Sequence, residues 1–195
     1  MAGRGVPTAP SRLTLALHKP RGVLTTAQDP EGRPTVFDLL PPGTPRLVAA
    51  GRLDQASRGL LILTNDTALA DRLTSPSAHI PKTYHARLDR RLSPGEVTAL
   101  AAGVVLDDGV PTRPCRVRVL REGRRACWLE LALTEGRNRQ VRRMAAALRP
   151  AAEVTDLVRV AIGGLPLGDL AAGKTRILDV GDLRRLFRFS STIPA

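Results

Sequence analysis

A run of six residues at 59–64, GLLILT, places the strongest constraint on how this chain can fold. The run has no charge and the length of a strand, which indicates a β-strand buried on both faces. Such a strand needs packing partners on each side. The 195 residues suffice for one sizeable domain, or for two small lobes around a shared core.

The remaining hydrophobic patterns predict a mixture of strands and helices. We expect strands within 12–20, 46–50, 82–89, 115–120, 125–133 and 154–164, and a short one after 175. Helices are expected within 65–76, 93–104 and 136–148, with another before 188 and a helical turn at 36–42. Ser93, Pro94 and Glu96 form the start signal of the second helix. Because the elements do not alternate strictly, an α+β fold is predicted.

Charge points to a nucleic-acid partner. The chain has 30 Lys+Arg against 18 Asp+Glu, a formal net charge of +12, and lysine only at positions 19, 82 and 174. Guanidinium groups bind phosphate bidentately, so an arginine-rich surface suits RNA or DNA. A GC-biased genome would explain the Arg/Lys ratio but not the net charge.

Metal and cofactor sites are not expected. Cys115 and Cys127 lack the CxxC spacing of a zinc site, and the three histidines are scattered, so we expect two buried thiols in a reducing cytoplasm. No nucleotide-binding or metalloprotease motif is present, and neither a signal peptide nor a membrane-spanning apolar run is found.

Asp54 is the first candidate for chemistry. It follows the strand predicted at 46–50 and lies between Gly51 and Gly59. A carboxylate on a loop at a strand end is a suitable catalytic position. The alternative is a turn aspartate that caps Ser57 or a nearby amide, and spacing alone slightly favours that alternative.

The segment 136–152 is the second candidate, because it has five arginines and no acidic residue: Arg137, Arg139, Arg142, Arg143 and Arg149. An apolar stripe docks its helix, which leaves the arginines on the other faces. They either form a solvated basic face or meet RNA phosphate or a site carboxylate. The lack of an acidic partner within the helix favours the second interpretation.

Tyr84, the single tyrosine, lies on a predicted strand. Such a residue is usually part of a core, although it could stack on one nucleobase. With 3% aromatic residues, a base-stacking platform on a sheet is poorly supported.

The segment GRLDQASRGLLILTND resembles the signature of the RsuA/RluB/RluE/RluF group of RNA pseudouridine synthases. Further motifs of that group flank it in the same order: HKPRGVLTT and GRPTVFDLLP before it, then KTYHARL, LTEGRNRQVRRM and LVRVAIGGLPLGDLAAGK. The resemblance covers about residues 13–187. It implies an α+β pseudouridine synthase fold, with a mixed, mostly antiparallel sheet, flanking helices and a central cleft.

The resemblance also implies an isomerase without metal or cofactor. Asp54 falls on the catalytic aspartate, Tyr84 on the tyrosine that stacks on the target base, and Arg142 on the arginine that pairs with the aspartate. Arg52 falls on the arginine that enters the RNA where the base leaves. The group's apolar pocket residue is either Leu157 or Ile162. The expected RNA-binding residues are Arg52, Arg137, Arg139, Arg143, Lys19, Arg21 and Lys82.

Within this group the chain is most similar to the RluE type, which lacks an S4 domain and modifies a uridine of 23S ribosomal RNA. We expect a disordered tail at 1–11, a catalytic domain at 12–188 and a C-terminal tail at 189–195. The expected protein is a cytoplasmic monomer whose partner is ribosomal RNA, free or in a precursor of the large subunit.

Two other functions compete with this interpretation. A non-catalytic factor that binds ribosomal RNA or assists ribosome assembly would share the charge, but would not need Asp54, Tyr84 and Arg142 together. A hydrolase with a carboxylate pair needs a second catalytic acid. The nearest, Asp66, has the position of a helix cap.

Overall fold

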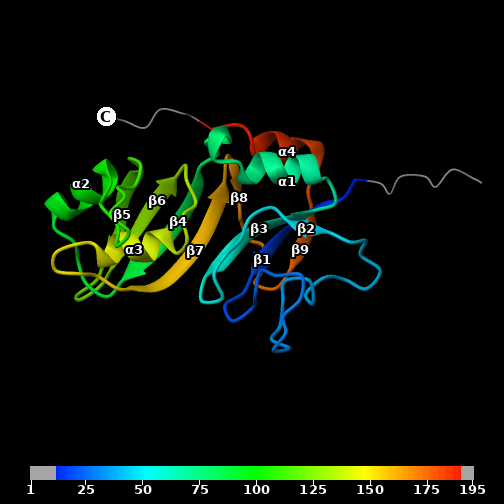
Figure 1. The fold of residues 1–195 in the computed structure, drawn as a ribbon, viewed down its shortest axis with the longest axis horizontal. Helices are drawn as coiled ribbons and strands as arrows, with labels where there is room; N and C mark the ends of the chain where they lie inside the picture. The colour runs from blue at the N-terminus through cyan, green and yellow to red at the C-terminus, as the bar shows by residue number, and fades with distance from the viewer. Residues whose placement is uncertain (1–11, 190–195) are drawn as a thin grey trace, which may run out of the picture.

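The computed structural model describes residues 12–189. The tail expected at 1–11, and residues 190–195 of the expected C-terminal tail, lie outside the described residues. Figure 1 shows one curved sheet with helices over it, which divides into two halves along its length.

The described strands form a nine-stranded sheet in the order β5-β6-β4-β7-β3-β1-β9, while β2 pairs with β3 and β8 with β7. The strands are β1 (Thr14–Lys19), β2 (Val48–Ala49), β3 (Arg58–Thr64), β4 (Lys82–Leu88), β5 (Arg116–Glu122), β6 (Cys127–Leu133), β7 (Val154–Ile162), β8 (Leu165–Pro166) and β9 (Thr175–Ile177). Among these pairs only β3 and β7 run parallel. The predicted α+β class with a mostly antiparallel sheet is confirmed.

The described α-helices are α1 (Thr67–Thr74), α2 (Pro94–Ala102), α3 (Gln140–Ala146) and α4 (Val180–Arg185), with a short 3₁₀ helix at Pro76–Ala78. Three of the four described α-helices, α1, α2 and α4, begin at a capping side chain, whereas α3 follows Arg139 without one. Asp66 caps α1 through the amide of Leu69, and Ser93 and Glu96 form the predicted capping box of α2. Asp66 thus acts as a helix cap.

Three hydrophobic clusters hold the layers together. Both α2 and α3 pack on one face of the β5-β6-β4-β7 half, through Leu100 and Met144 among others. On the other half, α1 and α4 pack on one face, and residues 23–47 cover the opposite face. The β3 run is buried as predicted, with Leu60, Leu61, Ile62 and Leu63 all inside the core.

Strand β2 is shorter than the expected 46–50. One edge of β3 is shared by two partners, because β7 pairs with Arg58 and Gly59 whereas β2 pairs with Leu63 and Thr64. The two halves of the sheet therefore remain joined over only two residues on this edge. Beyond that point β7 diverges from β3, and the chain at 50–57 lies beside the opening.

Gly59 is required at this junction. A Cβ atom there would lie 2.3 Å from the carbonyl oxygen of Arg159, and the φ of Gly59 is +116°. Only glycine combines this backbone angle with so close an approach of two strands.

We predict that Gly59→Ala destabilises the protein by about 3 kcal/mol, the sum of a positive-φ penalty and an overpacking penalty. Urea unfolding measures the change. Gly22→Ala is the matched control, since Gly22 also has a positive φ, +89°, but no atom within 4 Å of the added Cβ. Equal losses of unfolding free energy in the two variants would contradict the close approach of Gly59 to the backbone of Arg159.

Candidate active site

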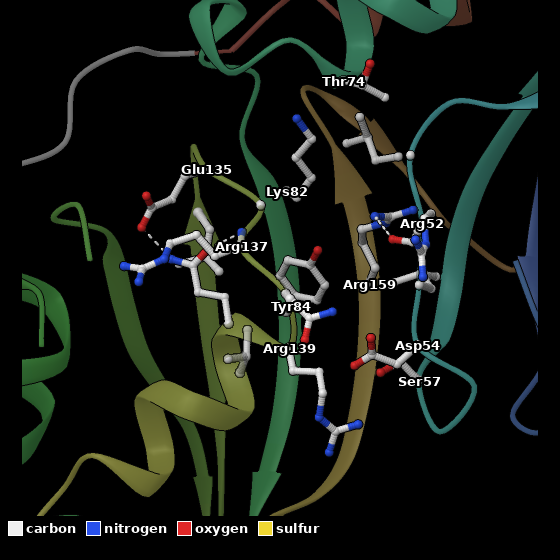
Figure 2. A pocket seen from close by; sticks show the side chains of 18 of the residues that line it. Arg52, Asp54, Ser57, Thr74, Lys82, Tyr84, Glu135, Arg137, Arg139 and Arg159 are labelled. Atoms are coloured by element: carbon white, nitrogen blue, oxygen red, sulfur yellow. Dashed lines mark hydrogen bonds between the residues drawn. The ribbon is translucent and has the colours of Figure 1, made fainter. Parts of the chain in front are cut away.

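A cleft of about 440 Å³ opens where β7 and β3 diverge. Residues 50–54 and Ser57 line one side, β4 and β7 line the floor, and residues 133–141 line the other side. Figure 2 shows Asp54 from the 50–57 loop, Lys82 and Tyr84 from β4, and Arg159 from β7 facing this space. The loop and strands of both halves of the sheet therefore build one site.

Lys19 fixes the loop that carries Asp54. Its ammonium group donates to the carbonyl oxygens of Asp54 at 3.1 Å and Ser57 at 2.8 Å, and also to those of Pro20 and Gln55. The side chain is fully buried. Burial lowers the pKa of Lys19 to about 8, partly offset by the negative charge of Asp54.

Arg159 holds the same loop from the other neighbouring strand. Its Nε donates to the carbonyl oxygen of Leu60 at 2.7 Å and its Nη1 to that of Arg52 at 3.3 Å. The residue is only 4% exposed, and its Nη2 has no hydrogen-bond partner among the described residues. This free donor belongs to a residue that lines the cleft.

Arg142 lies beside Asp54, as predicted. The Nε atom of Arg142 is 3.9 Å from Oδ2 of Asp54, and its Nη1 donates to the carbonyl oxygen of Val154 at 2.7 Å. Burial lowers the pKa of Arg142, the nearby charge of Arg139 lowers it further, and Asp54 raises it. The Nε and Nη2 atoms are buried without a hydrogen bond within the described chain. Arg142 and Asp54 therefore form a long ion pair, 3.9 Å between Nε and Oδ2, without a hydrogen bond.

Tyr84 lies on β4 between Leu131 of β6 and Arg159 of β7, and its ring reaches the cleft. Leu157 and Ile162, the two candidates for the apolar pocket residue, both line the cleft as well. The tyrosine and the two aliphatic side chains provide an apolar surface next to the Asp54 carboxylate.

Other basic residues surround this centre. Arg52 and Arg139 are exposed cleft residues. Lys82 lines the cleft and donates to the carbonyl oxygen of Leu73 at 3.1 Å, and burial lowers its pKa to about 8. Arg21 lies outside the cleft lining and is exposed, with its Nη2 donating to the carbonyl oxygen of Thr155 at 2.8 Å.

Three of the residues expected to bind RNA are engaged within the protein itself. Full burial of Lys19 excludes a direct contact with phosphate. Arg137 and Arg143 have counter-charges that the sequence analysis did not find, because Asp108 binds both and Asp107 binds Arg143. These aspartates lie on the loop after α2, so their charges balance two arginines of the 136–152 segment.

Sequence reasoning missed several lining residues. Arg159 was not proposed, although an arginine within the apolar strand pattern LVRVAI was a signal for a buried function. Glu135 was also missed; its Oε1 accepts hydrogen bonds from Gln140 Nε2 at 2.5 Å and from the amide of Arg113 at 3.0 Å. Glu135 therefore fixes the loop before α3.

Residues 12–189 contain neither a metal-binding cluster of side chains nor a membrane-spanning helix. No group of three or more histidine, cysteine, aspartate or glutamate side chains is placed to hold a metal ion. No helix in this range combines the length and the apolar character needed to cross a membrane.

Comparison with known proteins agrees with this geometry. Residues 14–147 match the family model described as RNA pseudouridylate synthase. A ribosomal large subunit pseudouridine synthase E of Xanthomonas campestris pv. campestris is 41% identical over 190 residues, 88% of this chain and 98% of the relative. A ribosomal large subunit pseudouridine synthase B of Escherichia coli K12 is 42% identical over 158 residues, 78% of this chain and 52% of the relative.

Two solved structures share the fold of this chain. A crystal structure of a pseudouridylate synthase superposes with a TM-score of 0.82 at 32% identity, covering 90% of this chain and 74% of that chain. An H/ACA RNP bound to a substrate RNA shares the fold at a TM-score of 0.57 and 16% identity, over 79% of this chain and 48% of that chain. The chain therefore belongs to the RNA pseudouridylate synthase family, and it is an enzyme of that class.

We predict that Lys19→Met destabilises the protein by about 2 kcal/mol, because the charged donor serves several carbonyl groups that would lose their partner. The difference in the free energy of unfolding between wild type and Lys19→Met should depend on pH. Since Lys19 has a pKa of about 8 when folded and 10.5 as its ordinary value, the folded state releases its proton first. The unfolded state then binds more protons, so the wild-type free energy of unfolding should rise relative to that of the variant between these pH values.

Urea unfolding of wild type and Lys19→Met across this pH range measures the effect. A stability difference that stays constant with pH would contradict the low pKa of Lys19. Lys174→Met is the control, because Lys174 shows none of the hydrogen bonds that Lys19 makes and should leave the pH dependence unchanged.

Proposed function

We propose that this enzyme converts a specific uridine of 23S ribosomal RNA to pseudouridine. The ion pair between Arg142 and the Asp54 carboxylate, at a cleft that Asp54 and Tyr84 both line, is the observation that carries the proposal. The names of the relatives in Xanthomonas campestris and Escherichia coli, both synthases of the large ribosomal subunit, support the choice of RNA.

The reaction moves a base without changing the composition of the RNA. The bond from C1′ to N1 of uracil breaks, the uracil rotates and a bond from C1′ to C5 forms. The hydrogen on C5 then leaves as a proton, and N1 takes up a proton from solvent. The uridine must first leave its stack, at a cost of a few kcal/mol. Stacking of the uracil on Tyr84 and an apolar contact with Leu157 would offset part of that cost.

Asp54 would act on the ribose, either by attack at C1′ or by removing the proton at C2′. Both routes need an ionised carboxylate. Arg142 lies beside this carboxylate, with its Nε 3.9 Å from Oδ2, and would orient it, while Lys19 and Arg159 hold the loop behind it. The exposed Arg52 stands next to Leu53 and Asp54 at the cleft, where it could replace the departing base in the RNA.

The remaining contacts are with phosphate. Arg139 and Lys82 line the cleft and Arg21 lies beyond it, so we assign the RNA backbone to these cations. We further propose that the protein acts as a monomer in the cytoplasm, since one chain supplies every group of the site. Its substrate would be free 23S RNA or a precursor of the large subunit.

We predict that Asp54→Asn lowers turnover by at least about 10²–10⁴-fold, the range supplied by a positioned catalytic group. Its affinity for RNA should stay close to that of wild type, because asparagine is nearly isosteric but uncharged. The assay counts tritium released to water from 23S and 16S RNA carrying tritium at C5 of uracil. Release from 23S RNA by wild type alone is the expected result, and equal release by both proteins would remove Asp54 from the mechanism.

We predict that Arg142→Met lowers kcat by about 10²-fold, the loss typical of one electrostatic donor at a reaction centre. It should leave the free energy of unfolding unchanged or raise it, since two nitrogen atoms of Arg142 are buried without a hydrogen bond within the described chain. Tritium release and urea unfolding measure the two effects. Parallel losses of kcat and stability would instead assign Arg142 a structural role. Arg149→Met, an exposed change in the same segment, is the control.

A further inference from the structure

The outer face of the β5-β6-β4 half-sheet, opposite α2 and α3, has no role in the site described above. Side chains alternate along each strand, so the neighbours of the core residues point to this face. The outer face consists of Thr83, His85 and Arg87 on β4, Trp128, Glu130 and Ala132 on β6, and Arg116, Arg118 and Arg121 on β5.

Cross-strand register arranges these residues in rows. Arg87 lies opposite Trp128, which lies opposite Arg121, while His85 lies opposite Glu130, which lies opposite Arg118. The two registers together therefore place the tryptophan between two arginines. A shift in the β5 register between Val119 and Arg121 brings Arg121 to the same face as Trp128.

None of the three hydrophobic clusters formed by the described residues includes the outer face. Arg87, Arg116, Arg118 and Arg121 are exposed. This half of the sheet therefore presents its outer face to solvent.

Most of the cations on the outer face are unpaired. Within residues 12–189, Arg87, Arg116 and Arg121 have no ion pair and no side-chain hydrogen bond. Arg118 pairs with Glu130 at 3.4 Å, and Glu130 also contacts His85 at 3.3 Å. On the outer face of these three strands four arginines thus accompany one carboxylate, while Asp156 of β7, opposite Arg87, is already paired with Arg21 and Arg58. The outer face therefore keeps a positive charge next to an aromatic ring.

Trp128 is the single tryptophan of the chain and is only partly buried. Its indole N–H has no hydrogen-bond partner in the part of the chain that the structure describes. An aromatic ring among arginines on an open sheet is the surface that stacks bases of single-stranded RNA and binds its phosphates. A second copy of this chain is a poorer partner, because an isologous contact would bring like-charged arginines together.

We propose that the outer face binds a single-stranded segment of the RNA substrate, with a base stacked on Trp128 and phosphates bound by Arg87, Arg116 and Arg121. This proposal rests on the proposed function, since it assigns a second contact to the same RNA. Tyr84 and Arg87 lie on opposite faces of β4, so a short stem-loop that fills the cleft would not cover both surfaces. The outer face therefore serves long RNA.

The fluorescence of Trp128 reports on this surface directly, because no other tryptophan contributes. We would titrate wild type with a short oligoadenylate, and with a 23S RNA fragment, and follow the emission. Stacking predicts saturable quenching by both. An RNA fragment that binds by filter retention without changing the emission would overturn the proposal. Emission that changes with protein concentration alone, together with dimerisation, would assign the face to a second copy and also overturn it.

Variants test the same point by affinity and turnover. The triple variant Arg87→Gln, Arg116→Gln, Arg121→Gln should reduce the slope of log affinity against log salt by about 2, since each single-strand phosphate contact contributes about 0.7. Its KM for the long fragment should rise with kcat unchanged, and its turnover of a minimal stem-loop should equal that of wild type. Trp128→Leu should weaken binding of the oligonucleotide at least about fivefold.

A charge-matched control removes three exposed arginines elsewhere, Arg46→Gln, Arg184→Gln and Arg188→Gln, with the same change in net charge. Equal salt slopes for the two triple variants would overturn the proposal. Failure of the proposed function gives a different pattern, because wild type would then release no tritium from any RNA while quenching of Trp128 could still be measured.

Discussion

The active-site loop depends on two buried cations that neutralise its backbone from within. Lys19 on β1 and Arg159 on β7 flank β3 in the sheet, and each donates to carbonyl groups of residues 52–57. Burying two positive charges is expensive unless they are fully hydrogen-bonded or paired. Asp54 supplies the nearby negative charge, so the carboxylate and the cations that hold its loop stabilise one another.

The cleft itself follows from the way the sheet divides. Strands β3 and β7 pair at Arg58 and Gly59 and then diverge, and the loop at 50–57 lies against the space between them. Gly59 permits the contact, Arg159 lies opposite it, and Tyr84 follows on the next strand. The elements that give rigidity to the two halves thus also set the distance between the Asp54 carboxylate and the ring of Tyr84.

Local patterns were sufficient for most elements of the fold. The apolar run of β3, the cap at Asp66 and the capping box at Ser93 each depend on neighbours in sequence, and all three are found. The site was a different case. From its spacing alone, Asp54 could be either a turn residue or a catalytic residue. Only the resemblance carried by several motifs in order predicted that Arg142 lies beside it.

Contacts between distant residues explain why the sequence did not reveal the partners of several cations. Lys19 precedes Pro20 and Arg21, a basic context that suggests an RNA contact. Its burial depends instead on carbonyl groups 35–38 positions away. Arg137 and Arg143 seemed unpaired because Asp107 and Asp108 lie 29 and 35–36 positions earlier. Composition likewise does not reveal that Trp128 lies on an uncovered face.

The most direct test of the central claim, that Asp54 held in this loop performs the isomerisation, is a map of pseudouridine in ribosomal RNA. A strain that lacks the gene would be complemented with wild type or with Asp54→Asn, and modified positions would be read by carbodiimide-dependent stops of reverse transcription. The account predicts that one position of 23S RNA is lost in the deletion strain and restored by wild type only. Restoration of that position by Asp54→Asn would contradict it.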